Sequence, residues 1–263
     1  MRFFILSDIH SNIEALDACI RRAKQASYDA VFCCGDLVGY GPNPVEAIDA
    51  VRDLNAVVVR GNHDRVTGNQ DEAAEFNPHA RRAVFWTRSV LPESYRQYLA
   101  ELPVGPLQVQ PDAQLVHGAI THEDDYVFTS ADASENLRLA GTRLTFFGHS
   151  HFPAVFAADP AGKSATPPTY EFDEFTAVRC DGDQRFLVNP GSVGQPRDGD
   201  PRASFVIWDR DRGRLEFYRV EYPVATTQSK MWDVRLPTTL VWLRDKDTLP
   251  SWHKKADGTW VPD

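Results

Sequence analysis

The side chains best suited to chemistry in this chain stand in five short clusters, each directly after an apolar segment. They combine imidazole with carboxylate, a mixture that suits Mn, Fe, Zn or Co, whereas Ca and Mg prefer all-oxygen ligands. The pattern therefore predicts a site for divalent transition metals. The clusters are Asp8-Ile9-His10, Gly35-Asp36, Gly61-Asn62-His63-Asp64, His117-Gly118 and Gly148-His149-Ser150-His151.

Two of the clusters place their metal-ligating residue types two positions apart. Asp8 precedes His10, and His149 precedes His151, with one residue between the members of each pair. On an extended chain alternate side chains point to the same side, so each pair can face one ion. A glycine beside four of the clusters would let the backbone come close to an ion. These glycines are Gly35, Gly61, Gly118 and Gly148.

The apolar segments before the first three clusters are predicted to be strands separated by helices. Residues 2–7, 30–34 and 56–60 are apolar runs, and residues 12–26 carry apolar side chains at helical spacing. A second helix is predicted after Asn43, because Asn, Pro and then Glu three positions after the Asn are typical of a helix start. Alternating strands and helices indicate a parallel sheet with right-handed crossovers. Since ligands bind beyond the carboxyl ends of such strands, the clusters are expected to converge.

The remainder of the chain changes from helical to strand signals. Residues 71–102 are predicted to be helical with breaks at Pro78 and Pro92, and residues 132–139 form a further predicted helix. Residues 159–169, rich in Pro, Gly and Ser, are expected to form an exposed loop. Strands, the later ones alternating as antiparallel strands with one wet face do, are predicted at 107–109, 114–117, 144–147, 153–157, 170–178, 186–189, 203–209 and 214–221.

No composition shift marks a domain boundary, so one domain over residues 1–222 is expected. The tail, residues 223–263, holds several tryptophans amid mixed charges and shows no clear period. We expect it to pack on the domain or to meet a partner subunit, which leaves a homo-oligomer open.

The amino-acid composition argues against some classes of binding partner. The formal net charge is -9 and the sequence pI is about 5.4, so the chain gains little from the counterion release that drives non-specific nucleic-acid binding. It also has no reason to adhere to an anionic membrane. The adjacent Cys33 and Cys34 indicate buried thiols, not a disulfide framework. The N-terminus reaches Asp8 too soon for a signal peptide, so a cytoplasmic location is expected.

Taken in order, the five clusters resemble the motifs of the calcineurin-like metallophosphoesterase superfamily. The family pattern is DxH, GD, GNH[DE], a lone His and GHxH, and this chain matches all five within residues 1–210. Residues 189–197 resemble the NPGS loop of the small bacterial and archaeal phosphodiesterase branch. The resemblance implies an α/β fold, a four-layer α/β/β/α sandwich of two mixed sheets flanked by helices.

The resemblance also implies two divalent metal ions. Mn is the expected metal, with Fe, Ni, Zn or Co as alternatives. His63 would be the general acid or a transition-state stabiliser, oriented by Asp64. One ion would be bound by Asp8, His10, Asp36 and His151, and the other by Asp36, Asn62, His117 and His149, with Asp36 bridging them.

General chemistry agrees with such roles. Two metal ions can clamp the attacking and leaving oxygens of an in-line displacement, and they lower the pKa of water so that a bridging hydroxide is a ready nucleophile. Their charge would outweigh the carboxylates of Asp8 and Asp36 and attract a phosphate into an acidic protein.

Simpler interpretations exist for single residues. Any one cluster could be an ordinary polar strand end, whereas five in order favour a metal site. Asp64 could equally be a turn residue. Arg197 and His79 are candidate substrate-binding residues, although each also fits a surface position.

We therefore expect a dinuclear phosphoesterase that hydrolyses phosphodiesters, with monoesters as a further option, acting on a small phosphate ester such as a nucleotide. The alternatives are a protein phosphatase, a dinucleoside polyphosphate hydrolase and a non-catalytic scaffold with the same fold. The complete set of ligands and His63 favours an enzyme over a scaffold. Arg60 and Arg197 are the evident arginines near the motifs, too few to choose among the substrates.

Overall fold

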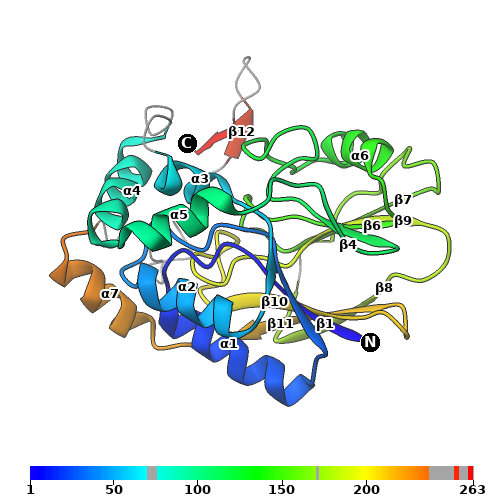
Figure 1. Ribbon diagram of the computed structural model, residues 1–263. Helices are drawn as coiled ribbons and strands as arrows, with labels where there is room; N and C mark the ends of the chain where they lie inside the picture. The colour runs from blue at the N-terminus through cyan, green and yellow to red at the C-terminus, as the bar shows by residue number, and fades with distance from the viewer. Residues whose placement is uncertain (70–75, 170–171, 237–251, 255–259, 263) are drawn as a thin grey trace.

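Two mixed β-sheets packed face to face form the centre of the protein (Figure 1). The computed structural model describes residues 1–69, 76–169, 172–236, 252–254 and 260–262. The first sheet runs, in spatial order, β3 (Val57–Val58), β2 (Ala30–Cys33), β1 (Arg2–Leu6), β10 (Ala203–Asp209), β11 (Arg214–Val220) and β8 (Phe175–Arg179). The second runs β4 (Leu107–Gln110), β5 (Ala113–Leu115), β6 (Leu144–Phe146), β9 (Arg185–Asn189) and β7 (Ala154–Ala158). A separate ribbon pairs β12 (Trp252–Lys254) with β13 (Trp260–Pro262).

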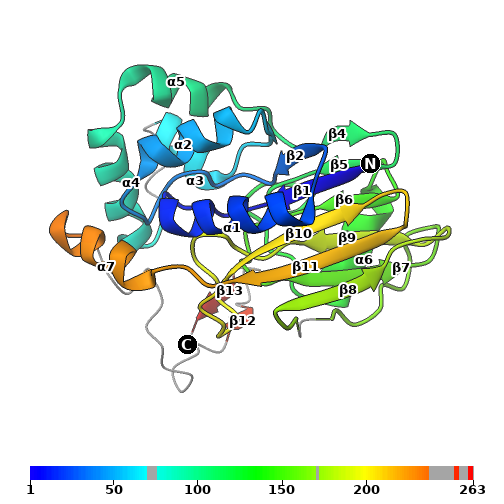
Figure 2. The same cartoon turned by 90° about the horizontal axis from the view of Figure 1, so that it is seen from below.

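Helices cover the outer faces of both sheets, which makes four layers (Figures 1 and 2). On the first sheet lie α1 (Ile13–Ala26) and α2 (Pro44–Asp53), whose apolar faces share one buried cluster with β1 and β10. On the second sheet lies α6 (Ser130–Leu139), which packs on β7 and β9. The predicted α/β/β/α sandwich is confirmed. The other helices are α3 (Asn62–Gly68), α4 (Pro78–Val90), α5 (Glu93–Glu101) and α7 (Val224–Asp233).

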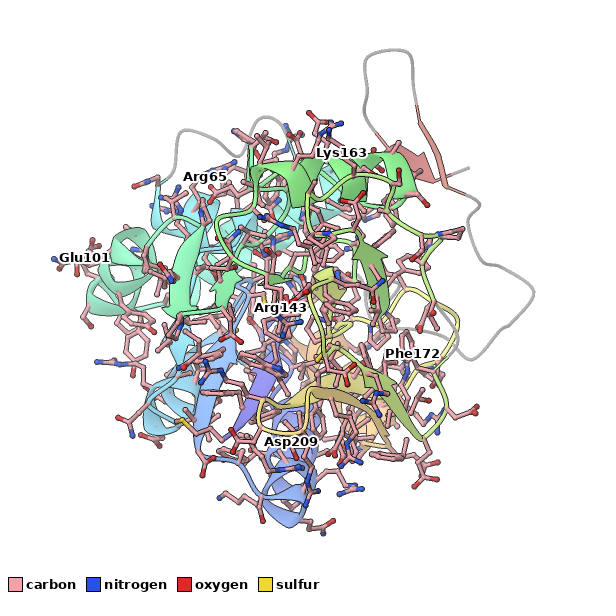
Figure 3. All side chains as sticks on the ribbon, turned by 90° about the vertical axis from the view of Figure 1, so that its right-hand side faces the viewer. Arg65, Glu101, Arg143, Lys163, Phe172 and Asp209 are labelled. Atoms are coloured by element: carbon pink, nitrogen blue, oxygen red, sulfur yellow. The ribbon has the colours of Figure 1, made fainter. Side chains whose placement is uncertain are left out.

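Strand β1 shows why the first apolar run is continuous. Phe4 and Leu6 pack with the helices, while Phe3 and Ile5 pack between the two sheets. Successive side chains of a strand point to opposite faces, so a strand buried on both faces needs apolar residues at every position. Side chains from both sheets form one buried cluster between them, and Figure 3 shows the side chains of the described residues on the ribbon. Here the ring of Phe3 stacks on Trp208 at 5.0 Å between centroids.

Parallel strands in both sheets end at a common edge. In the first sheet β1, β2 and β3 are parallel neighbours, and in the second β5, β6 and β9 are. The parallel pairing predicted for the first third of the chain is confirmed. The segments that follow these six strands carry Asp8, Asp36, Asn62, His117, His149 and Gln195 in turn.

The third strand is shorter than predicted. The sequence indicated residues 56–60, but β3 spans only Val57–Val58, because the N–H of Arg60 donates to the carbonyl of Pro103 at 2.8 Å instead of to a strand. Helix α3 then begins at Asn62, where no helix was predicted. The N–H of Gly61 donates to Asp64 Oδ2 at 3.1 Å and closes the first turn of α3.

The helical region after α3 breaks where the sequence predicted. Residues 70–75 lie outside the described residues. Helix α4 begins at Pro78, and Asn77 Oδ1 accepts the N–H of Ala80 at 3.0 Å as a cap. Helix α5 begins directly after Pro92. Both prolines therefore act as helix starts, where their missing N–H costs nothing.

The tail begins with a helix that the sequence did not reveal. In α7, Thr227 and Met231 are buried, and Thr227 Oγ1 donates to Glu14 Oε2 on α1 at 2.9 Å. Helix α7 has only two buried positions, too few to produce a recognisable helical period of apolar residues in the sequence. Residues 237–251, 255–259 and 263 lie outside the described residues. No helix in the described part of the chain has the length and apolar character that a bilayer crossing requires.

The layer between the sheets should carry much of the stability. Phe146 is fully buried there against Trp208, whereas Phe175 on β8 is 49% exposed. We expect Phe146→Ala to lower the free energy of unfolding by about 3–5 kcal/mol, and Phe175→Ala by less than about 1 kcal/mol. Urea denaturation of both variants checks this, and equal losses would contradict the assigned core.

Candidate metal centre

The first group of ligand atoms comes from the segments after β1 and β6. The Nε2 atoms of His10 and His151 lie 3.0 Å apart. Asp8 Oδ1 lies 4.0 Å from His10 Nε2 and 3.4 Å from His151 Nε2. All three side chains are buried. The three ligand atoms are thus close enough to share one ion.

In this group the imidazoles of His10 and His151 turn the lone pairs of their Nε2 atoms toward each other. His10 Nδ1 lies 3.0 Å from the carbonyl oxygen of Val38, and His151 Nδ1 lies 2.6 Å from that of Gln195. A carbonyl only accepts hydrogen bonds, so each Nδ1 carries the proton and each Nε2 is left as an acceptor. Two acceptors 3.0 Å apart repel unless a cation lies between them. This pairing of donor atoms fits a metal ion.

The second group draws on both sheets. His117 Nε2 lies 3.4 Å from Asp36 Oδ2 and 3.2 Å from Asn62 Oδ1, and its Nδ1 faces the carbonyl of Cys34 at 2.7 Å. His149 is turned the other way, because its Nε2 lies 3.1 Å from the carbonyl oxygen of Asp124. Its Nδ1 is therefore the atom left to bind an ion, together with Asp36 and His117.

Asp36 joins the two groups. Its Oδ2 lies 3.6 Å from His10 Nε2 in the first group and 3.4 Å from His117 Nε2 in the second. Its Oδ1 accepts the backbone N–H of His63 at 2.9 Å, which fixes the carboxylate. One oxygen is thus held by the protein while the other faces both groups, as a bridging ligand would need.

The buried charges of the site favour the binding of a cation. Burial raises the pKa of the Asp8 carboxyl to about 7. Burial also favours the neutral form of Asp36, but the imidazoles of His117 and His63 hold its pKa well below the usual range. Burial opposes protonation of His117, yet Asp36 raises the pKa of that imidazole to about 10. A proton on His117 therefore neutralises Asp36 in the way that a metal ion can.

The backbone at the ligands is held in an unusual conformation. Five of the seven predicted ligands have positive φ, between 48° and 64°. Non-glycine residues in this left-handed region cost of the order of 1–3 kcal/mol each, and such strain clusters at functional sites. The prediction that each two-residue spacing lies on an extended chain was wrong, because the strands end before these residues begin. The five are Asp8, His10, Asp36, His149 and His151.

Two glycines allow the segments to approach one another. A Cβ on Gly61 would lie 2.8 Å from the carboxyl carbon of Asp36 and closer still to its Oδ1. A Cβ on Gly148 would lie 2.8 Å from Asp8 Oδ2. Real Cβ atoms do not come so near, so the glycines are required by the close packing of ligand against backbone.

His63 stands at the edge of the first group. Its ring lies edge-on to His10 with centroids 4.9 Å apart, and it also contacts Tyr40 and Phe76 at 4.4 Å and 4.8 Å between centroids. Burial lowers the pKa of its imidazole to about 4. A ligand atom of His63 comes within 4.8 Å of those of His10 and Asp36, so it is near enough to act on anything bound there.

Asp64 does not contact the imidazole of His63 in the predicted way. Its Oδ1 accepts the N–H groups of Leu37 and Val38 at 2.9 Å and 3.3 Å, and its Oδ2 accepts the N–H of Gly61. The carboxylate therefore ties the segment after β2 to the start of α3. These contacts position the backbone, as those of a turn residue would, and none of them reaches the imidazole of His63.

A cavity of about 330 Å³ opens onto both ligand groups. Its walls are largely aromatic, and the ring of Tyr126 stacks on His149 at 4.0 Å between centroids. Ligands from both groups face into it. The cavity is lined by Asp36, Tyr40, Asn62, His63, Arg65, Phe76, Asn77, Ala80, Asp124, Tyr126, His149, His151 and Arg197.

The structure separates the two candidate substrate-binding residues. Arg197 lines the cavity, and its guanidinium lies 5.9 Å from the ring centroid of Tyr40. His79 is exposed on α4, and the residues of that segment that face the cavity are Asn77 and Ala80. A helix start was predicted there, but the side of the helix that turns inward depends on tertiary packing.

Several lining residues were missed from the sequence. Arg65 follows the GNHD cluster by one residue, and the apparent turn hid that it lies on a helix facing the site. Tyr40 and Tyr126 stand in loops without any periodic signal. A search for aromatic or basic residues within a few positions of each motif would have found Arg65 and Tyr40 but not Tyr126, which lies eight positions after Gly118.

Comparisons with known proteins agree with this geometry. The family model of the calcineurin-like phosphoesterase superfamily domain matches residues 1–213. An uncharacterized protein of Methanocaldococcus jannaschii is 34% identical over 243 residues, covering 90% of this chain and 94% of that protein. The crystal structure of a metallophosphoesterase from Sphaerobacter thermophilus is similar with a TM-score of 0.81 and 39% identity, covering 92% of this chain and 96% of that one.

A shorter likeness points to one class of relatives. A symmetrical bis(5'-nucleosyl)-tetraphosphatase of Stutzerimonas stutzeri is 37% identical over 67 residues, which is 24% of each chain.

The close approach at Gly61 gives a test of the centre that needs no substrate. We expect Gly61→Ala to weaken Mn binding at least tenfold, because the new methyl group must displace Asp36. Gly141→Ala is the matched control, since a Cβ there meets only Gln114 at an ordinary 3.4 Å. Isothermal titration of the metal-free proteins with Mn measures both. Unchanged affinity in folded Gly61→Ala protein would mean that Asp36 is not a ligand.

Proposed function

Because this chain belongs to the calcineurin-like phosphoesterase superfamily, whose members hydrolyse phosphate esters, we propose that it cleaves phosphodiesters with two divalent metal ions. The observation that carries the proposal is the placement of Asp36 Oδ2 between His10 and His117, one from each ligand group. A single shared carboxylate oxygen is the arrangement that two neighbouring cations need.

The residues fit the two ions in number and type. Asp8, His10, Asp36 and His151 would hold the first, and Asp36, Asn62, His117 and His149 the second. Nitrogen and oxygen donors together suit Mn, Fe, Zn, Co or Ni, and Mn is our first choice. When bound, the pair would supply charge neutralisation for the phosphate and an activated water.

Arg197 is the side chain that we assign to the substrate phosphate. Among the described residues its contacts are with neutral groups, since its Nη2 donates to Gln195 Oε1 at 2.8 Å and it interacts with the hydroxyls of Tyr40 and Tyr126. A largely buried guanidinium gains most from an anionic partner. A phosphate oxygen in the cavity would provide one.

The charge balance of the cavity supports a diester over more highly charged substrates. Arg65 also lines the cavity, but it is paired with Glu123 and Asp124, and Arg60 is paired with Glu123. These two arginines are thus already neutralised. Among the described residues Arg197 forms no ion pair, although the charge of Asp8 acts on it. Together with the aromatic rings of the cavity wall, it suits a singly charged phosphate that carries a group on each side.

His63 is proposed to act on the leaving oxygen. It lies beside the first ligand group, faces the cavity and is fixed between the rings of His10, Tyr40 and Phe76. From there its neutral ring can donate an N–H hydrogen bond to an ester oxygen, and a proton once the negative charge of a bound phosphate raises its pKa. Asp64 would support it only indirectly, through the backbone of α3.

Two rival functions remain open to experiment. The short likeness to a dinucleoside tetraphosphatase makes such a nucleotide a necessary member of any substrate panel. A scaffold without activity has less support, because the full set of seven ligand side chains lies around the cavity or directly behind it.

Hydrolysis of a synthetic diester tests the proposal directly. With added Mn we expect turnover of bis-p-nitrophenyl phosphate at a higher kcat/KM than p-nitrophenyl phosphate or a dinucleoside tetraphosphate. Treatment with a chelator should abolish it, and Mn should restore it. Absence of turnover with every divalent metal, from folded protein that binds the metal, would contradict the proposal. A preference for the tetraphosphate would instead favour the dinucleoside alternative.

Replacement of His63 separates chemistry from metal binding. We expect His63→Ala to lower kcat by about 10²- to 10⁴-fold while the bound Mn per chain stays near that of the wild type. His79→Ala, which removes an exposed histidine from α4, should leave both values unchanged. Metal analysis beside steady-state kinetics decides the matter. Loss of metal together with activity would make His63 a ligand.

A further inference from the structure

The segment from His117 to Tyr126 touches the second ligand group at three points. It supplies His117 itself, and the carbonyl of Asp124 lies 3.1 Å from His149 Nε2. The ring of Tyr126 stacks on His149 with an interplanar angle of 23°. The orientation of His149 therefore depends on where this segment lies.

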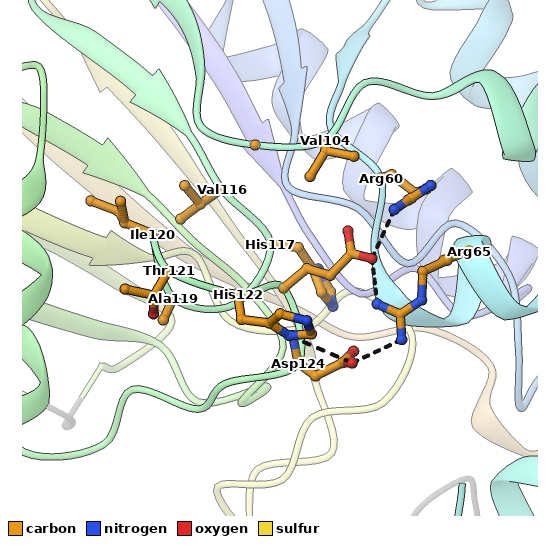
Figure 4. A pocket seen from close by; sticks show the side chains of 12 residues that line it. Arg60, Arg65, Val104, Val116, His117, Ala119, Ile120, Thr121, His122 and Asp124 are labelled. Carbon is orange, nitrogen blue, oxygen red and sulfur yellow. Dashed lines mark hydrogen bonds and ion pairs between the residues drawn. The ribbon is translucent and has the colours of Figure 1, made fainter. Parts of the chain in front are cut away.

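A second cavity is lined largely by residues of the same segment (Figure 4). Its volume is about 520 Å³, and it shares Arg65 and Asp124 with the first cavity. No side chain of the described residues fills this space, so these residues do not pack against the segment from within it. Among the residues that line it are Arg60, Arg65, His117, His122, Glu123 and Asp124.

Ion pairs connect the segment to Arg65 on α3 and to Arg60. Arg65 reaches Asp124 Oδ2 at 2.8 Å and also binds Glu123, while Arg60 binds Glu123 at 3.0 Å (Figure 4). The side chain of Asp124 is 30% exposed, but those of Arg65 and Glu123 are only 11% and 8% exposed. Such pairs are screened little by solvent, and breaking one leaves a buried charge without its partner.

Arg65 is well placed to link the segment to the ligands. It lies on α3 three residues after Asn62, which belongs to the second group. The N-terminal turn of α3 is itself fixed by the carboxylates of Asp36 and Asp64. Arg65 thus extends from a rigid part of the site to a segment that has a cavity behind it.

We propose that Arg65 is a positioning residue for the second metal ion, an inference that rests on the proposed dinuclear function. Its ion pair with Asp124 holds the carbonyl of that residue against His149 Nε2. The contact keeps the proton on Nε2 and turns Nδ1 toward Asp36 and His117. Other contacts still hold the rest of the segment, since Ile120 N–H donates to Asn136 Oδ1 and Ala119 is buried. Without Arg65, however, Asp124 loses its ion pair beside the second cavity, and the contact between its carbonyl and His149 Nε2 is expected to weaken.

The effect is specific to the second ion. The imidazoles of the first group are fixed by the carbonyls of Val38 and Gln195, which lie in other segments. Arg65 contacts neither of them in the described interactions. Loss of Arg65 should therefore spare the first ion, whereas a general loss of structure would affect both.

Metal binding by Arg65→Gln tests this, with a readout independent of turnover. Metal-free protein is equilibrated against a series of Mn concentrations, and the bound Mn per chain is measured with the spectrum of coupled Mn pairs. We expect the first ion to bind as in the wild type and the second at least tenfold more weakly, so that the coupled signal is lost at low Mn. Excess Mn should restore it, and Arg65→Lys, which keeps the charge but not the two-pronged contact, should lie between.

Two further variants guard against misfolding and indirect effects. Asp124→Asn keeps the backbone carbonyl but removes the charge, and it should reproduce Arg65→Gln, with the double variant no worse than either single one. Arg60→Gln is the matched control, because Arg60 pairs with Glu123 and does not reach Asp124. It should keep both ions.

The outcomes distinguish this inference from the proposed function. Two ions of unchanged affinity in Arg65→Gln, or equal weakening of both, would overturn the positioning role and leave the dinuclear proposal standing. A wild-type protein that binds one ion at every Mn concentration would overturn both together.

Discussion

The site depends on charge that must be neutralised on side chains that are almost wholly buried. Asp8 and Asp36 are fully buried, and the imidazoles around them turn their lone pairs inward because their other nitrogens are committed to backbone carbonyls. Without a cation these groups repel or must take up protons, as the pKa shifts of Asp8 and His117 indicate. Metal ions would satisfy them all at once, which would explain why so many polar groups can be buried in one place.

The two sheets bring these buried groups together. Three parallel strands of each sheet end at the same edge, so that ligands separated by more than a hundred residues meet within a few ångströms. The chain passes through the left-handed region at five ligands to turn their side chains inward. The stability of the inter-sheet layer, from Phe3 to Trp208, offsets that strain. Precise placement of ligands is thus a consequence of a rigid core with irregular segments at its edge.

Much of this could be predicted from the sequence, for physical reasons. Strand β1 is an unbroken apolar run because both its faces are buried, and the polar cluster after it marks the edge of the sheet. The residue types and their order predicted which side chains meet in the candidate metal centre. The rest depended on tertiary contacts that leave no local pattern. Nothing near Asp64 reveals that its carboxylate binds the backbone after β2, and nothing near Arg65 reveals its partners 58 and 59 residues further along the chain. From the spacing of Asp8 and His10 we predicted correctly that the two side chains lie together, although the extended backbone assumed for them was wrong. Strained turns and extended strands can both place alternate residues on one side.

Anomalous diffraction from crystals loaded with Mn tests the central claim most directly. The account predicts two peaks about 3.5–4 Å apart, with Asp36 contacting both, Asp8, His10 and His151 around one, and Asn62, His117 and His149 around the other. A single peak, or two peaks that do not share Asp36, in a crystal whose seven side chains are ordered would contradict it.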